Sequence, residues 1–247
     1  MTNFRYIKPR LYGAIGYRPY WAYTYLAFDS FLRGFYRKYK FIPLNYYEFG
    51  TGKGGSLIEF LKALRRLLKV DLYRKIALDT GVNIMLFDSF EGLPAPKSTK
   101  DVYPVHYKGA FANSEENIRR LVNDNSHHIN PKPHVITVKG YYEDTLNNTL
   151  RENLKAFPPS FVHVDVDYYS SARTVLNFIA PICQNGTIFH FNNIYEYLGN
   201  LNKGEYAAIS EFNNNETYHL FPYRLFTIPE YINQVFTMHK TDLSEHA

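Results

Sequence analysis

Length and composition fit a single large α/β domain of a soluble protein, because the chain has 247 residues, 45% of them hydrophobic and 21% charged. The one cysteine, Cys183, excludes an intramolecular disulfide and a cysteine-rich zinc site. The formal net charge of +5 is concentrated in residues 1–40, where eight Lys and Arg residues stand against Asp29 alone.

The segment 1–40 is aromatic as well as basic, and we expect it to form a mostly helical preface to the domain. Such a segment suits an anionic partner, although a solvated helix surface accounts for the same charges. No signal-type apolar segment follows the first basic residues, and the stretch 20–36 contains Asp29 and Arg33, which make it too polar to span a bilayer. We therefore expect a cytoplasmic protein with no transmembrane segment.

From residue 41 onward, strand-like and helix-like segments alternate, which predicts a parallel sheet with helices on both faces. The expected strands are 42–49, 83–87, 134–138, 161–166 and 187–191. The expected helices are 56–68, 114–125 (with Ser114 as its N-cap), 143–157, 172–182 and 203–212. Two late strands, 217–221 and 224–228, are separated by Pro222 and Tyr223 and predict an antiparallel hairpin. The fold class is thus a doubly wound, Rossmann-like α/β domain with a seven-stranded sheet, mostly parallel with a C-terminal antiparallel hairpin.

A glycine-rich loop, 50–56, follows the first predicted strand and reads Gly-Thr-Gly-Lys-Gly-Gly-Ser. Its glycines allow a tight turn and close approach of a ligand, and the helix that follows favours an anionic group. The spacing excludes a nucleotide-binding P-loop but satisfies the Gly-x-Gly-x-x-Gly of dinucleotide sites, so an oxidoreductase is one alternative. A second alternative is S-adenosylmethionine (SAM) binding, with Glu48 as the acidic residue before the glycines. A third is a strand-to-helix turn that binds no ligand.

The run Leu86–Pro94 places Asp88 at the end of the second strand, where a carboxylate can accept both ribose hydroxyls, although a turn or capping role accounts for it too. This run resembles the signature of the macrocin O-methyltransferase family, a group of SAM-dependent sugar and natural-product methyltransferases. Residues Lys139–Leu146 and His163–Ser171 resemble two further segments of that family. With the glycine loop, the four segments occur in the family's order over residues 46–193.

The resemblance implies a SAM-dependent O-methyltransferase that acts on a hydroxyl of a sugar or a glycosylated small molecule. It also implies roles for individual residues. Glu48, Gly50, Thr51 and Gly52 would lie along the SAM methionine and ribose, with Ser56 near the carboxylate, Asp88 and Ser89 at the ribose, and Gly140, Tyr141 and Tyr142 at the adenine. Asp165 would face the sulfonium and the acceptor hydroxyl, and we expect Asp165 and Asp167 to be the catalytic carboxylates.

The sequence departs from the family where the family places two adjacent Asp residues, after the fifth strand, to bind a metal together with the strand-four Asp. This chain has Asn192 and Asn193 there, and Mg²⁺ favours carboxylate oxygens. Four alternatives are open. A metal binds weakly through Asp165, Asn192 and Asn193; Asp167 or Glu196 compensates; transfer is metal-independent, with Asp165, a histidine or a tyrosine as base; or the chain binds SAM with lost or altered catalysis.

The division of the chain that follows is a methyltransferase domain at 41–247 and, at 1–40, a segment that the resemblance makes a lid or an oligomer contact. The expected partners are a small-molecule acceptor that contains a sugar and a second copy of the chain. Nucleic acid is not expected, because the basic residues cluster at one end and no Asn/Asp-Pro-Pro-Tyr type motif is present.

Overall fold

The computed structural model describes residues 44–223 and 234–241. The aromatic, basic segment 1–40 and the expected strand 224–228 therefore lie outside the described residues, as do the lid and oligomer contacts expected of the first segment. Among the residues that are described, none of the helices combines the length and the apolar character that a bilayer crossing requires.

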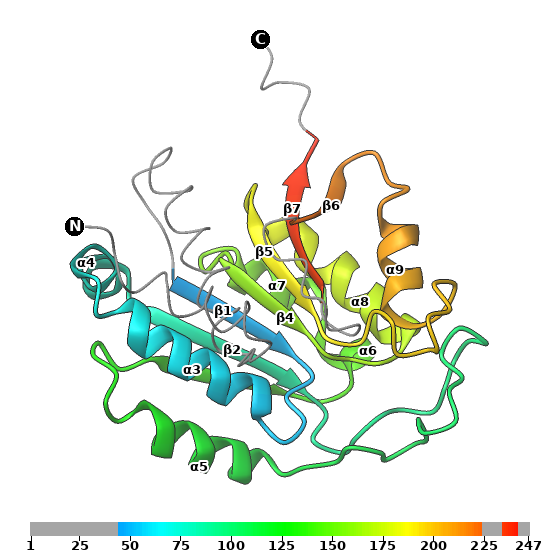
Figure 1. Ribbon diagram of the computed structural model, residues 1–247, viewed down its shortest axis with the longest axis horizontal. Helices are drawn as coiled ribbons and strands as arrows, with labels where there is room; N and C mark the ends of the chain where they lie inside the picture. Colours follow the sequence, from blue (N-terminus) through cyan, green and yellow to red (C-terminus); the bar gives the residue numbers. More distant parts are fainter. Residues whose placement is uncertain (1–43, 224–233, 242–247) are drawn as a thin grey trace, which may run out of the picture.

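Seven strands form one sheet in the order β3-β2-β1-β4-β5-β7-β6 (Figure 1). They are β1 (Leu44–Phe49), β2 (Val82–Asp88), β3 (His134–Lys139), β4 (Phe161–Val164), β5 (Thr187–Phe191), β6 (Tyr218–Pro222) and β7 (Gln234–Lys240). The first five are parallel, and β7 pairs antiparallel with both β5 and β6. The predicted fold class is confirmed, C-terminal antiparallel pair included. The strand that pairs with β6 begins at Gln234, beyond the expected strand at 224–228, which lies outside the described residues.

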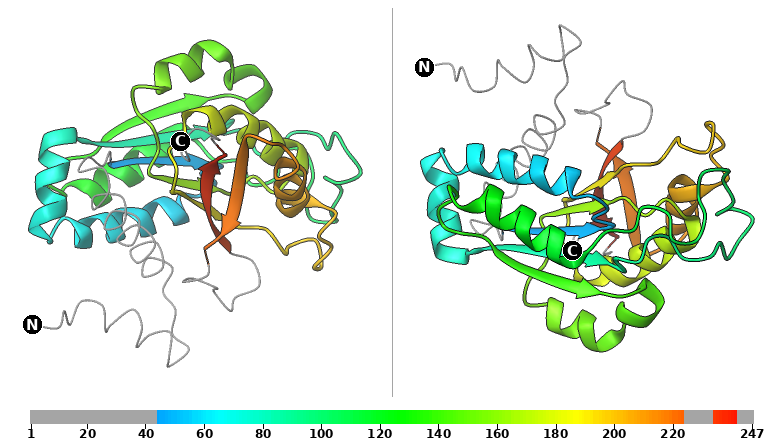
Figure 2. Two further views of the ribbon diagram at one scale, coloured as in Figure 1. Left: turned by 90° about the horizontal axis from the view of Figure 1, so that it is seen from above. Right: turned by 90° about the horizontal axis from the view of Figure 1, so that it is seen from below.

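Helices cover both faces of the sheet (Figure 2). On one face lie α3 (Gly55–Leu67), α4 (Asp71–Thr80) and α5 (Glu115–Ser126), whose buried residues pack in one apolar cluster. On the other lie α6 (Tyr142–Thr145), α7 (Asn148–Leu154), α8 (Tyr169–Ile179), the short 3₁₀ helix η1 (Ala180–Ile182) and α9 (Gly204–Phe212), around a second cluster. Both faces of the central strands are thus excluded from water, which is why these strands read as continuous apolar runs.

Strand β1 shows how the two clusters divide. All six of its residues are buried, and successive side chains alternate between the faces. Tyr46 stacks on Phe60 of α3, with ring centroids 3.8 Å apart. Phe49 points to the opposite face and stacks on Phe87 of β2 at 4.4 Å. The aromatic content of this region is therefore largely core packing.

Side-chain caps start two of the helices, one as expected and one not. Ser114 caps α5 as predicted, because its hydroxyl accepts a hydrogen bond from the Asn117 N–H. The single helix expected over 143–157 is interrupted before Asn148, because the Asn147 side chain accepts from the Leu150 N–H and starts a new helix there. Helix α4 was not predicted, since its apolar stripe covers fewer than three turns.

The carboxyl ends of β1 and β4 meet at the point where the strand order reverses. Strand β4 ends at Val164, two residues earlier than expected, so Asp165 follows the strand rather than lying in it. Gly50 has a positive φ of 81°, and a Cβ atom there would lie 1.9 Å from the Asp165 carbonyl oxygen. Only glycine allows the loop after β1 to approach the chain after β4 this closely.

Candidate active site

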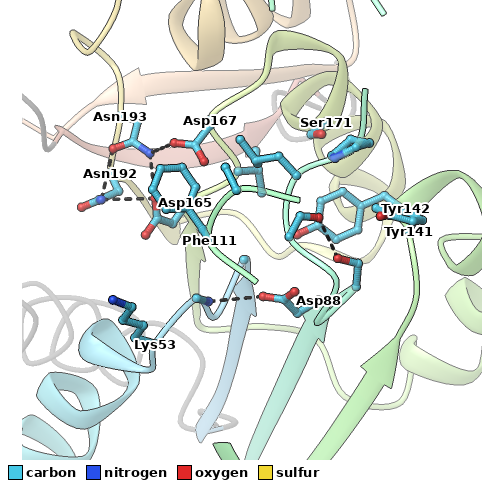
Figure 3. Close-up of a pocket in the computed structure, with 18 of the residues that line it drawn as sticks. Lys53, Asp88, Phe111, Tyr141, Tyr142, Asp165, Asp167, Ser171, Asn192 and Asn193 are labelled. Atoms are coloured by element: carbon cyan, nitrogen blue, oxygen red, sulfur yellow. Dashed lines mark hydrogen bonds between the residues drawn. The ribbon is translucent and has the colours of Figure 1, made fainter. Parts of the chain in front are cut away.

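A cavity of about 440 Å³ opens at the carboxyl ends of the parallel strands (Figure 3). Its walls come from residues within 50–53, 88–94, 140–143, 165–171 and 192–196, together with Ala110 and Phe111 of the long loop before α5. This size is typical of sites for small molecules. The predicted residues Gly50, Gly52, Asp88, Ser89, Gly140, Tyr141, Tyr142, Asp165, Asp167, Asn192 and Asn193 all line the cavity.

Asp88 joins the glycine loop to the end of β2. Its Oδ2 atom accepts hydrogen bonds from the Thr51 N–H at 2.7 Å, the Thr51 hydroxyl at 2.9 Å and the Gly52 N–H at 3.3 Å. Its Oδ1 atom accepts from the Phe90 N–H at 2.7 Å. The carboxylate thus shapes two of the loops that line the cavity while presenting one edge to it.

Glu48 and Ser56 lie beneath the glycine loop and do not line the cavity, and neither does Thr51. The Glu48 side chain is completely buried and accepts hydrogen bonds from the hydroxyls of Tyr46, at 2.7 Å, and Ser56. Burial raises the pKa of Glu48 to about 8, against the opposing effect of these two hydrogen bonds. The structure therefore places Glu48 where it supports the loop from the core rather than where it would touch a ligand.

Tyr141 and Tyr142 form the end of the cavity opposite Asp165 and Asp167 (Figure 3). The Tyr142 hydroxyl donates to the Phe87 carbonyl at 3.3 Å, and its ring meets Phe49 edge-on at 6.1 Å. These contacts fix the ring against the sheet. Ser89 shapes the loop after β2, since its hydroxyl donates to the Gly92 carbonyl at 3.0 Å.

Two carboxylates and two amides form a network at the other end. Asp165 Oδ1 accepts hydrogen bonds from Asn192 Nδ2 at 3.2 Å and Asn193 Nδ2 at 2.8 Å. Asn193 Nδ2 also donates to Asp167 Oδ1 at 2.6 Å, so one amide group bridges the two carboxylates. Asp167 has a φ of 58°, a backbone conformation that is uncommon outside glycine and that turns its side chain back towards Asn193.

This network does not fit a magnesium ion held by Asp165, Asn192 and Asn193. Asp165 is the one carboxylate of the three, and both asparagines direct their amide nitrogens at it. In the structure the Asn193 NH₂ group donates to both carboxylates, and its oxygen points away from them. A hard dication would need oxygen atoms where these nitrogens lie.

The pKa values of both aspartates are raised. Burial raises the pKa of Asp165 to about 6. For Asp167, burial is again the largest cause, and the negative charges of Asp165 and Glu196 add to it, so that its pKa lies well above the usual range of an aspartate. A carboxylate in such a setting is a stronger base than one in water, which suits it to accept a proton from a ligand.

Glu205 of α9 lies behind the network, completely buried. Its two carboxylate oxygens accept the backbone N–H groups of Val166 and Asn193, both at 3.0 Å, and so hold the ends of β4 and β5 together. Burial raises its pKa to about 8. Glu205 was not predicted as a site residue; the signal in the sequence was an acidic residue in a helix whose neighbours are mostly small and apolar.

His106, from the long loop between β2 and α5, was also not selected, because nothing near it in the sequence marks a strand end. Its Nε2 atom lies 3.2 Å from Glu196 Oε1 and 3.6 Å from Asp167 Oδ1, and its side chain is completely buried. His106 does not itself line the cavity, but both of its acidic neighbours do.

Comparison with known proteins identifies the fold as that of class I methyltransferases. A calicheamicin methyltransferase, CalS11, matches with a TM-score of 0.62 and 21% identity over 86% of this chain and 77% of that one. The O-methyltransferase NovP matches with a TM-score of 0.55 and 17% identity over 85% and 78%. A second CalS11 structure, described as a TDP-rhamnose 3'-O-methyltransferase, has a TM-score of 0.53, 17% identity and 86% and 77% coverage. No known protein-family profile and no curated protein matches the chain.

Proposed function

We propose that this protein is a SAM-dependent O-methyltransferase of the macrocin type, and that its acceptor is a hydroxyl of a sugar or of a glycosylated small molecule. The observation that carries the proposal is the single cavity in which a glycine loop, the Asp88 carboxylate and a buried carboxylate network meet at the point where the strand order reverses. The shared fold and the four sequence segments support it.

In this proposal SAM lies across the cavity. The backbone of Gly50 and Gly52 and the side chain of Asp88 flank its methionine and ribose, while Gly140, Tyr141 and Tyr142 border the adenine. Glu48, Thr51, Ser56 and Ser89 hold the loops in shape. The methyl group would then face the opposite end of the cavity, where Asp165 and Asp167 lie.

The acceptor would enter between the carboxylate network and Phe111. Bound SAM would supply the methyl group: as the acceptor oxygen bonded to the methyl carbon, the carbon–sulfur bond would break and S-adenosylhomocysteine would leave. The acceptor proton passes to Asp167, whose raised pKa allows it to hold that proton. Holding oxygen, methyl and sulfur in line supplies a large part of the rate acceleration.

A sugar suits this end of the cavity because hydrogen-bond acceptors and an amide line one wall and an aromatic side chain lines another. Asp167, Asn193 and Glu196 can bind neighbouring hydroxyl groups, and the exposed Phe111 can cover the apolar face of a sugar ring. The similarity to CalS11, a TDP-rhamnose 3'-O-methyltransferase, supports a sugar acceptor. The alternative of a SAM-binding protein without catalysis is not favoured, because a buried, basic carboxylate remains at the reacting end.

The proposal is tested by titrating the protein calorimetrically with S-adenosylhomocysteine and, in a second titration, with NAD. Saturable binding of the first but not the second is expected. Turnover is then measured by mass spectrometry with SAM and a panel of nucleoside diphosphate sugars and deoxysugar glycosides, with aglycones lacking the sugar as controls. Binding of NAD alone would overturn the methyltransferase assignment, and methylation of the aglycones alone would overturn the sugar acceptor.

A further inference from the structure

One group of metal-ligating side chains adjoins the positions where the family binds its metal but consists of other residues, with Asn193 Nδ2 donating to Asp167 Oδ1 at 2.6 Å between the two. His106 Nε2 and one carboxylate oxygen each from Asp167 and Glu196 all lie within 4.8 Å of one another. Donor atoms bound at roughly 2.0–2.2 Å to one dication are separated by about 3 to 4 Å. The two distances from His106 Nε2, 3.2 Å and 3.6 Å, fall in that range.

The carboxyl groups around this cluster have no lysine or arginine partner among the described residues. They belong to Asp165, Asp167, Glu196 and Glu205, which converge here. The second carboxylate oxygen of Glu196, Oε2, is buried, and no hydrogen-bond donor reaches it within the described part of the chain. A buried carboxylate oxygen without a donor costs free energy unless a cation satisfies it.

The His106 ring is held in a fixed orientation. The rings of Tyr103, Phe111, Tyr168 and Tyr197 surround it, with centroids 5.0 to 6.1 Å away. Its Nδ1 atom faces the Tyr197 hydroxyl at 3.5 Å, which leaves Nε2 directed at the two carboxylates. Metal-binding histidines characteristically have such a polar partner at the nitrogen that does not bind the metal.

We propose that His106, Asp167 and Glu196 bind a transition-metal dication of the Mn²⁺ to Zn²⁺ series. One imidazole and two carboxylates suit these ions better than Mg²⁺, which prefers oxygen ligands alone. Asp167 and Glu196 line the cavity, so the open coordination positions face it. The metal site does not depend on the proposed methyl transfer; only its use in orienting an acceptor oxygen rests on that function. In the metal-bound protein Asp167 would be an anionic ligand, so the acceptor proton would pass to Asp165, the other aspartate at this end of the cavity.

The test is a titration of the metal-free protein with Co²⁺, followed by visible absorption, with Mg²⁺ as the comparison. We expect one saturable Co²⁺ site with d–d absorption, and we expect Zn²⁺ to displace Co²⁺ from it where Mg²⁺ does not. His106→Gln and Glu196→Gln should each weaken Co²⁺ binding by at least about 100-fold. Loss of a residue that only supports a metal ligand weakens binding by up to about 100-fold, and loss of a ligand itself should have a larger effect. His128→Ala, a change to an exposed histidine, and Asn192→Ala should leave Co²⁺ affinity unchanged.

Thermal unfolding and S-adenosylhomocysteine binding of each metal-free variant show whether the variant is folded. If His106→Gln does not fold, Co²⁺ binding by Glu196→Gln tests the metal site instead. No saturable Co²⁺ binding, or binding that survives both substitutions, would overturn the proposal. Loss of binding in Asn192→Ala would overturn it too, because the cation would then lie on the asparagines. Co²⁺ binding without any binding of S-adenosylhomocysteine would refute the proposed function and leave the metal site standing.

Discussion

Four buried carboxyl groups with raised pKa values occupy the region between the glycine loop and α9, and they differ in what they face. Asp165 and Asp167 line the cavity, whereas Glu48 and Glu205 bind hydroxyl or backbone groups of the protein itself. Burial is the largest cause of the pKa shift in all four. The first pair is therefore expected to control chemistry, and the second to control stability.

Asp167→Asn should lower kcat for methyl transfer by about 10² to 10⁴, the usual contribution of a general base. The affinity for S-adenosylhomocysteine should change little, because the substituted group lies at the acceptor end. Both quantities are measured, by turnover and by calorimetry, beside Asp79→Asn on the exposed side of α4. A variant that keeps its turnover would remove Asp167 from the role of base.

Glu48→Gln should stabilise the protein at pH 8 and have little effect near pH 4.5. The folded pKa, about 8, lies above the ordinary value of 4.5, so the wild-type protein loses stability as pH rises between these values. A glutamine amide remains neutral throughout and still bonds the hydroxyls of Tyr46 and Ser56. The melting temperatures of variant and wild type are compared at both pH values.

Glu152→Gln, at a carboxylate with 62% side-chain exposure, is the control for that comparison. If the difference between Glu48→Gln and wild type is the same at pH 4.5 and pH 8, the assigned pKa shift is wrong. Retained binding of S-adenosylhomocysteine would agree with the position of Glu48 beneath the loop.

At the scale of elements, periodicity predicted most strands and helices because each buries a regular stripe. Helix α3 is an example, with Leu57, Phe60, Leu61 and Leu64 on its inner side. The last strand was predicted at 224–228 because only Pro222 and Tyr223 separate that segment from the strand before it. The site was predicted only where its residues end strands or belong to recognisable runs.

The remaining part of the site depends on contacts that no local pattern records. His106 meets Glu196 across 90 residues, and Glu205 meets Val166 across 39. Neither partner can be identified from residues nearby in the sequence, since the long loop and α9 are brought to the site only by tertiary packing.

Gly50→Ala should destabilise the protein by at least about 2 kcal/mol, because the added Cβ would collide with the Asp165 carbonyl and the backbone would be strained. Gly55→Ala is the matched control: its Cβ meets nothing within 4 Å, and alanine favours the helix by up to about 1 kcal/mol. Urea denaturation measures both. Equal stability of the two variants would show that the approach of the β1 and β4 loops is not constrained.

At the scale of the whole molecule, one side chain joins the long loop between β2 and α5 to the helical layer. Asp101 is completely buried, and its Oδ2 atom accepts the N–H groups of Lys97 and Ser98 at 2.9 Å. Its Oδ1 atom accepts the N–H of Ser170 in the first turn of α8, also at 2.9 Å. The loop also reaches α9, where the Gly204 N–H donates to the Lys100 carbonyl at 3.0 Å.

Asp101→Asn should cost about 1–3 kcal/mol, because an amide NH₂ would replace an acceptor that faces backbone N–H groups. The loop should then be released from α8, so limited proteolysis should cut it faster than in the wild-type protein. Asp124→Asn, on the exposed part of α5, is the control. Unchanged cleavage within residues 97–108 would show that other contacts hold the loop.

Strand β1 lies in the middle of the sheet, and one of its two neighbours, β4, comes much later in the chain. The Asn45 carbonyl accepts the hydroxyl and the N–H of Ser160, which is 115 residues away. During synthesis on the ribosome, β1 to β3 therefore emerge with one long apolar strand edge unpaired. Such edges invite aggregation. A nascent chain that stalls before β4 is the form of this protein that most needs a chaperone.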